Sequence, residues 1–181
     1  MEINKIYNEN CLDTMAKMPD GFVDLTVTSP PYDNLRTYNG YSFDFEAVAK
    51  ELYRVTKQGG VVVWVVGDAT IKGSETGTSF RQALWFKDCG FNLHDTMIYR
   101  KINYVPLTHN RYEQEFEYMF VFSKGKPKTF NPIKIPCKTA GAKTSGRTFY
   151  QTNNQNTPTA GHKNNTVSVC KQKGNVWELS T

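Results

Sequence analysis

The chain contains 181 residues, of which 39% are hydrophobic and 22% are charged, and its formal net charge is +5. This length indicates one domain with room for an appended segment, and the positive charge is compatible with a polyanionic partner. The longest apolar run, VVVWVV at residues 61–66, is far shorter than the ~20 residues of a membrane-spanning helix. The N-terminus has no apolar signal core. We therefore expect a cytoplasmic protein with no membrane partner.

The N-terminal part of the chain predicts short strands and helices. Residues 3–8 (INKIYN) are expected to form a strand and residues 12–18 a short helix. Residues 23–28 (VDLTVT) alternate in polarity and end at a Pro-Pro corner, which indicates another strand. Asp44 is expected to open an amphipathic helix that closes at Gly59-Gly60.

The next segments continue the alternation. Residues 61–68 (VVVWVVGD) are apolar on both faces, as in a central parallel strand. Ser79 and Gln82 fit a capping box at the start of a second amphipathic helix. Residues 92–101 and 117–125 are typical of two more strands. The pattern predicts an open α/β sheet, mostly parallel, with helices on both faces.

The C-terminal part has a different composition. From about Pro132 the chain is polar and Gly-rich without periodicity, and we expect a long loop or lid there. Residues 124–173 contain many Lys and Arg and no Asp or Glu. This segment is either a solvated loop or a surface for a polyanion. The four cysteines are widely spaced, which predicts reduced thiols and no metal site.

The corner Ser29-Pro30-Pro31-Tyr32 follows the 23–28 strand, and open α/β sheets bind ligands beyond the carboxyl ends of their strands. The Ser29 hydroxyl and the Pro30 carbonyl are acceptors, and Pro31 fixes the direction of that carbonyl. Tyr32 offers a flat ring for stacking. Two acceptors beside an aromatic plane suit an exocyclic amino group on a planar ring. The alternative is a rigid turn that closes the strand.

The chain resembles the amino-methylating DNA methyltransferases of the β-type, which modify cytosine N4 or adenine N6 with S-adenosylmethionine. Their signature, Asp/Asn/Ser-Pro-Pro followed by an aromatic residue after an apolar strand, stands here as DLTVTSPPY. The stretches GGVVVWVVGD, SFRQALWFKDCGF and RYEQEFEYMFVFSKGKPKTFNPI match later blocks. The resemblance implies a partial Rossmann-like methyltransferase fold, with a catalytic region at 1–132 and a truncated target-recognition region at 133–181.

The resemblance also implies a reaction on double-stranded DNA. Ser29 and the carbonyl of Pro30 would hold the amino group, Pro31 would fix the corner, and Tyr32 would stack on the base. Positioning and electrostatics then let the amino nitrogen attack the sulfonium methyl in line, without a covalent enzyme intermediate. The target base must leave the duplex to reach the site. Ser at position 29 leans modestly toward cytosine N4, and the recognition sequence stays open.

Four other residues are candidates for binding DNA, and each could instead have an ordinary structural role. Arg36 and Tyr38 could contact phosphate or the flipped nucleotide, or belong to an ordinary loop. Asp68 ends the central strand near the same edge, where a helix cap or a loop acid is equally expected. Arg111 could hold a phosphate or pair with a nearby glutamate.

Only some of the residues that would bind the cofactor can be identified in the sequence. By resemblance, Asn10 and Cys11 would contact the adenosine of S-adenosylmethionine, whereas the alternative for Asn10 is a helix N-cap. The family's Asp-Pro-Phe-x-Gly-Ser-Gly block is missing, and no Gly-x-Gly occurs in this chain. Three explanations stay open: a truncated gene product, a chain that needs a second polypeptide with the cofactor-binding half, or a DNA-binding remnant without activity. The partner expected besides DNA is that second chain or, alternatively, a second copy in a homodimer.

Overall fold

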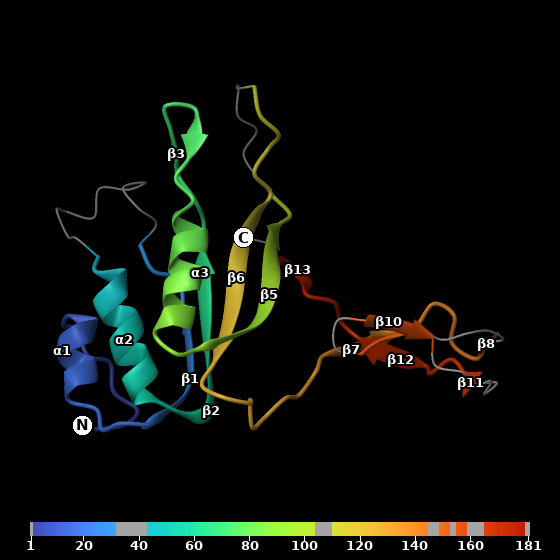
Figure 1. Cartoon of the computed structure of the whole chain (residues 1–181), viewed down its shortest axis with the longest axis horizontal. Coiled ribbons are helices and arrows are strands. Elements are labelled where there is room, and N and C mark those ends of the chain that lie inside the picture. Colours follow the sequence, from blue (N-terminus) through green and yellow to red (C-terminus); the bar gives the residue numbers. More distant parts are fainter. Residues whose placement is uncertain are drawn as a thin grey trace. The chain divides into compact units, whose positions relative to one another are not determined.

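The computed structural model describes residues 2–31, 43–103, 110–144, 149–152, 155–158 and 165–179. The chain divides into two compact units (Figure 1). Unit 1 comprises Met1–Phe130 with Asn175–Thr181, and unit 2 comprises Asn131–Gly174. Tyr32, Arg36 and Tyr38 lie outside the described residues.

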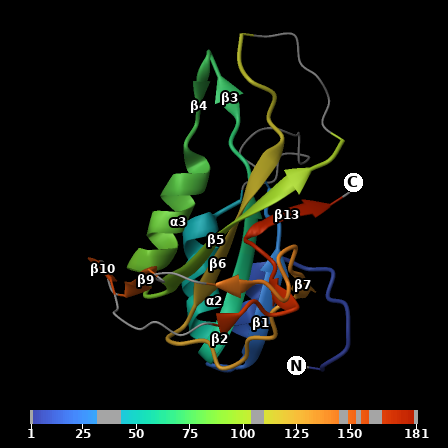
Figure 2. The same ribbon diagram turned by 90° about the vertical axis from the view of Figure 1, so that its right-hand side faces the viewer.

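Unit 1 contains three helices, a five-stranded sheet and a small hairpin among its described residues. The helices are α1 (Cys11–Ala16), α2 (Phe45–Val55) and α3 (Thr78–Asp88). The sheet strands are β1 (Val23–Thr28), β2 (Thr56–Val66), β5 (Asn92–Lys101), β6 (Phe116–Ser123) and β13 (Val176–Leu179). The hairpin consists of β3 (Thr70–Ile71) and β4 (Ser74–Glu75) and projects beyond the first turn of α3 (Figures 1 and 2).

The sheet is mixed, with the strand order β1-β2-β6-β5-β13. The β1/β2 and β5/β13 pairs are parallel, whereas β6 runs antiparallel to both β2 and β5. The expected α/β architecture is present, but the sheet is not mostly parallel. The reason is that β6 follows β5 in the chain and turns back beside it, as consecutive strands often do.

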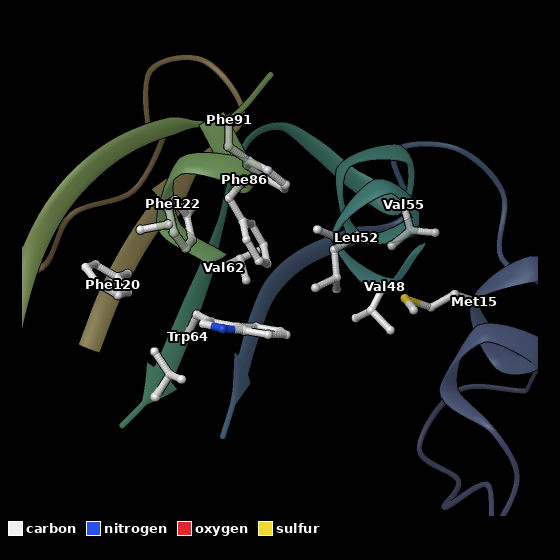
Figure 3. Packing of buried hydrophobic residues seen from close by; sticks show 13 residues of the cluster. Met15, Val48, Leu52, Val55, Val62, Trp64, Phe86, Phe91, Phe120 and Phe122 are labelled. Atoms are coloured by element: carbon white, nitrogen blue, oxygen red, sulfur yellow. The ribbon is translucent and has the colours of Figure 1, made fainter. Parts of the chain in front are cut away.

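The described helices cover one face of the sheet, where the sequence predicts helices on both. Alternate residues of β2 and β6 pack against α2 and α3, and Trp64, Phe86 and Phe122 point toward one another in the resulting core (Figure 3). The Trp64 and Phe86 ring centroids lie 4.9 Å apart, and those of Phe86 and Phe122 lie 4.4 Å apart. On the opposite face of β1, Leu25 and Val27 are 57% and 66% exposed.

The start of α2 agrees with the sequence prediction, whereas the end of α2 and the start of α3 differ from it. Asp44 caps α2 as expected, because its Oδ1 accepts a hydrogen bond of 3.0 Å from the Ala47 amide. The helix ends at Val55, however, and the two glycines expected to close it lie inside β2. The predicted capping box at Ser79 is wrong, since the N-cap of α3 is Gly77, in the left-handed region at φ 65°.

Two further predictions are wrong. Residues 3–8 form no strand. Unit 2 is not a structureless loop, because its described residues form three two-stranded antiparallel ladders. The strands are β7 (Lys134–Pro136), β8 (Lys143–Thr144), β9 (Phe149–Thr152), β10 (Gln155–Pro158), β11 (Asn165–Thr166) and β12 (Cys170–Gln172). No helix in the described part of the chain is long and apolar enough to cross a membrane.

Candidate active site

The Pro-Pro corner lies directly after β1, at the carboxyl end of the parallel β1/β2 pair. Ser29 is exposed, Pro30 is buried and Pro31 is half-buried. A buried proline followed by a second proline holds the backbone of this corner in one direction, because both rings restrict φ. The corner therefore presents the Ser29 hydroxyl outward from a fixed backbone.

A cavity of about 590 Å³ adjoins this corner. Its wall includes Ser29, Pro30 and Pro31 on one side and Cys11 on α1 on another. Most of the remaining lining is apolar and comes from β1, α2 and the core residue Trp64. Two segments that are distant in the sequence, the start of α1 and the end of β1, thus border the same space.

Asn10 and Cys11 differ in their relation to this cavity. The Asn10 side chain caps α1, with its Oδ1 accepting a hydrogen bond of 3.0 Å from the Leu12 amide. This contact matches the helix-cap alternative. Cys11 is exposed and lines the cavity, so it is the member of the pair that a bound molecule would touch.

Trp64 was not singled out by the sequence, yet it lines this cavity. Its ring is only 1% exposed, and its Nε1 donates a hydrogen bond of 2.8 Å to Oε1 of Gln82, which is 3% exposed. The indole thus has a partner for its single donor, as a buried Trp needs. The sequence carried no specific signal for this pair, because the run at 61–66 is apolar throughout and does not single out Trp64.

Asp68 follows β2 at the same end of the sheet and is tightly bound. Its Oδ1 accepts hydrogen bonds from the Ser79 amide at 2.9 Å and from the Thr76 hydroxyl at 3.3 Å, and its Oδ2 accepts a short one from the Ser79 hydroxyl. These contacts tie the end of β2 to the first turn of α3. They match the structural alternative for Asp68.

A second cavity of about 610 Å³ lies beside Asp68. Arg111, Glu75 and Tyr118 also line it. Nη2 of Arg111 donates a short hydrogen bond to the Gly73 carbonyl, and Nη1 lies 3.8 Å from Oε1 of Glu75. Arg111 therefore contacts the β3–β4 hairpin in addition to facing this space.

Tyr118 is a further residue that the sequence analysis did not single out. Partial burial raises the pKa of its phenol, and the negative charge of Asp68 adds to the rise. The phenol stays protonated at neutral pH and can donate a hydrogen bond into the cavity. Its place in an ordinary strand sequence (EYMFVF) provided no signal for this role.

The structure therefore groups the candidates in two sets. Ser29, Pro30, Pro31 and Cys11 border the first cavity, and Asp68 and Arg111 border the second. Within the described part of the chain, no cluster of three His, Cys, Asp or Glu side chains could hold a metal ion.

The chain is similar in sequence to known DNA methyltransferases. A family model described as DNA methylase matches residues 23–181. The orphan methyltransferase M.BamHII of Bacillus amyloliquefaciens is 74% identical over 112 residues, covering 62% of this chain and 42% of that protein. The type II methyltransferase M.MthZI of Methanothermobacter thermautotrophicus is 31% identical over 165 residues, covering 70% of this chain and 46% of that protein. The chain thus spans less than half the length of these curated relatives.

Solved structures share the fold. The PvuII DNA methyltransferase (cytosine-N4-specific) superposes with a TM-score of 0.58 at 23% identity, over 67% of this chain and 50% of that one. A proposed DNA modification methylase from Thermus thermophilus, solved in complex with S-adenosyl-L-methionine, has a TM-score of 0.51 at 25% identity. That match covers 70% of this chain and 56% of the other. The partial Rossmann-like α/β methyltransferase fold implied by the resemblance is confirmed.

Proposed function

The chain belongs to the DNA methylase family, and we propose that it carries the catalytic corner of an enzyme that methylates an exocyclic amino group, cytosine N4 or adenine N6, in double-stranded DNA. The methyl donor in this proposal is S-adenosylmethionine, and the target base is rotated out of the duplex. The observation that carries the proposal is the fixed Ser29-Pro30-Pro31 backbone at the mouth of a cavity that also reaches Cys11.

The corner supplies acceptors for the amino group. The Ser29 hydroxyl and the Pro30 carbonyl would each accept one of its hydrogens, which turns the nitrogen lone pair toward the methyl donor. The nitrogen would form a bond to the methyl carbon as the carbon–sulfur bond breaks, which leaves a neutral thioether, and the methylated nitrogen would then release its extra proton to water. Because the backbone at Pro30 and Pro31 is already held in place, little reorganisation is needed in the transition state. Tyr32, by its place in the sequence, would stack on the base.

The first cavity fits part of the cofactor. S-adenosylmethionine would supply an electrophilic methyl group on a sulfonium. The volume of about 590 Å³ and the mainly apolar lining suit an adenine ring, with Cys11 at the wall. The described residues of that lining include no carboxylate, so they offer no acidic partner for the ribose hydroxyls. The Thermus methylase solved with S-adenosyl-L-methionine supports the choice of donor.

In this proposal the second cavity binds the DNA substrate. Asp68 orders the end of β2 and the start of α3, and Tyr118 can donate a hydrogen bond to a nucleotide. Arg111 would face a phosphate while its contacts to the hairpin hold it in place. We assign Arg36 and Tyr38, which follow the corner in the sequence, to contacts with the same flipped nucleotide.

A partner chain or a second copy is part of this proposal. Leu25 and Val27, which also line the first cavity, present an exposed apolar surface on β1. Among the described residues, β1 pairs only with β2, so its other edge has unpaired backbone groups. A surface of this kind suits a polypeptide that adds a strand beside β1 and contributes the cofactor-binding half.

Methyl transfer tests the function directly. The chain would be mixed with labelled S-adenosylmethionine and unmethylated duplex DNA, and the digested nucleosides separated by mass spectrometry. Label in N4-methylcytosine or N6-methyladenine supports the proposal and names the base. Pro30→Ala and Tyr32→Ala should reduce the signal strongly, whereas Pro19→Ala, at an exposed proline before β1, should leave it unchanged.

A second function follows from a specific observation, the absence of an acidic group in the described lining of the first cavity. The chain would then bind DNA without transferring a methyl group. Retained duplex binding with no labelled nucleoside favours this second function. Equal methyl transfer by the wild type and by both corner variants would contradict the catalytic role of the corner.

A further inference from the structure

Helix α1 and the residues just after it form one wall of the first cavity. Cys11, Met15 and Met18 contribute this part of the lining. The helix has only 6 residues, and a helix of that length is unstable in water without tertiary contacts. Within α1, which is described throughout, Met15 alone is buried, and Figure 3 shows its side chain directed toward Val48 of α2. Further contacts are therefore needed to hold this wall in place.

Arg54, in the last turn of α2, supplies these contacts. Its Nη2 donates a hydrogen bond of 2.7 Å to the Met15 carbonyl, and its Nη1 donates one of 2.9 Å to the Met18 carbonyl. Carbonyls at the C-terminal end of a helix lack their usual amide partners within the helix. The guanidinium binds at this end and so holds the end of α1 against α2.

Two carboxylates fix the orientation of the guanidinium. Nε lies 3.1 Å from Oε1 of Glu51, and Nη2 lies 2.7 Å from Oε2 of the same residue. Nη1 also donates a hydrogen bond of 2.7 Å to Oδ1 of Asp20. With the two carbonyls of the α1 segment, these contacts provide an acceptor for each of the five N–H groups that an arginine side chain carries. The planar fork of Arg54 is therefore held in a single orientation.

The backbone of Arg54 contacts the segment that enters β1. Its carbonyl accepts a hydrogen bond of 3.0 Å from the Gly21 amide. Gly21 has φ 61°, in the left-handed region, so the chain can turn here between the end of α1 and β1. Arg54 is thus bonded to both segments that border the first cavity, the α1 wall and the strand that leads to Ser29.

We propose that Arg54 is a positioning residue for the cofactor, which holds α1 beside β1 so that the first cavity has the shape an adenosine group requires. This proposal rests on the proposed function, which places S-adenosylmethionine in that cavity. Arg54 is not part of the described lining, so it acts through α1 and does not touch the ligand. Lysine cannot replace it, because an ammonium donates from one point and cannot reach two carbonyls and two carboxylates together.

Ligand affinities test this role. The dissociation constants of the full chain would be measured by calorimetry for S-adenosylhomocysteine, the thioether left after methyl transfer, and by fluorescence anisotropy for a labelled DNA duplex. Arg54→Gln and Arg54→Lys should each weaken S-adenosylhomocysteine binding by about tenfold or more, because the wall is no longer preorganised. Duplex binding should change by less than about twofold, since the bonded partners of Arg54 lie outside the second cavity.

A core variant distinguishes positioning from a general loss of stability. Phe122→Leu removes packing from β6, where Phe122 stacks on Phe86 and lies outside the first cavity. It should lower Tm, as Arg54→Gln does, but change S-adenosylhomocysteine affinity by less than about twofold. Equal losses of affinity in these two variants would overturn the positioning role, and so would wild-type affinity in Arg54→Lys. Arg54→Lys keeps the charge beside Glu51 and Asp20, so it can be measured even if Arg54→Gln does not fold.

Hydrogen exchange separates this proposal from the proposed function. The amides of Thr14, Lys17 and Met18 donate hydrogen bonds within the α1 segment. Their exchange should become faster by about tenfold or more in the Arg54 variants, with β2 unchanged. If the wild type binds no S-adenosylhomocysteine but the variants release α1, the cofactor assignment fails and Arg54 still builds the wall. If the wild type binds it and the variants change neither exchange nor affinity, the role of Arg54 fails and the cofactor assignment stands.

Discussion

Asp68 offers a sharp test of how the end of β2 is built. Its carboxylate accepts hydrogen bonds from the Ser79 amide at 2.9 Å, from the Ser79 hydroxyl, and from the Thr76 hydroxyl at 3.3 Å. Ser79 is 0% exposed. Asp68→Ala therefore removes an anionic acceptor and leaves a buried amide and a buried hydroxyl without that partner.

The expected magnitude follows from those groups. An unsatisfied buried donor costs about 1–3 kcal/mol, and two are created here. Allowing for partial relaxation, Asp68→Ala should lower the free energy of unfolding by about 2–4 kcal/mol. For a chain of this size the corresponding drop in Tm is roughly 5–15 °C. Asp68→Asn should lose less, because its carbonyl can still accept one of the bonds and the Ser79 hydroxyl can turn.

Thermal and urea denaturation, followed by circular dichroism, measure the loss. Asp88→Ala, at the exposed C-terminal end of α3, is the matched control and should change stability by less than about 0.5 kcal/mol. In a double-mutant cycle with Ser79→Ala, the two losses should fall short of additivity by at least about 1 kcal/mol. A stable Asp68→Ala variant with weakened DNA binding would refute the structural reading and leave a nucleotide contact as the role of Asp68.

Two further predictions concern a tight turn and a thiol. Gly90→Ala should lower the free energy of unfolding by about 1–3 kcal/mol in denaturation experiments. Gly90 has φ +108°, and a Cβ at this position would lie 2.9 Å from the Tyr53 ring. At Gly73 a Cβ would meet no neighbour within 4 Å, so Gly73→Ala should cost less. Hydrogen bonding to a threonine two residues on lowers the pKa of Cys137, and burial raises the pKa of Cys89. The thiolate fraction at pH 7.5 is therefore larger at Cys137 than at Cys89, and peptide mass spectra should show iodoacetamide labelling Cys137 before Cys89. Faster labelling of Cys89 would contradict this.

Local sequence patterns predicted the elements whose causes are local. The cap at Asp44 and the apolar stripe of α2 depend on residues within one or two turns, and the structure confirms both. The α/β order and the strand before the Pro-Pro corner were also visible, because alternation and proline restrict the backbone directly.

Features that depend on distant residues were missed. The first turn of α3 takes its acceptor from Asp68, eleven positions earlier, so a capping box inside the helix was the wrong explanation for Ser79. Gln82, expected to complete that box, instead bonds Trp64 across the core. The ladders of unit 2 were missed because their strands are short and mostly polar, and such strands show no apolar alternation to detect.

The two faces of β1 differ in polarity, and this difference indicates that a further polypeptide could pack on the sheet. Thr26 and Thr28 stand beside Val62 and Trp64, on the face that the helices cover, while Leu25 and Val27 stand beside Val61 and Val63 on the other. A strand in a sheet covered on one side only would place its threonines toward solvent and its aliphatic residues toward the helices. Here the order is reversed, so the aliphatic residues of this part of β1 lie on the face that no described helix covers. The exposed aliphatic face is therefore suited to binding a further polypeptide, and strand addition beside β1 would bury it while pairing the open edge.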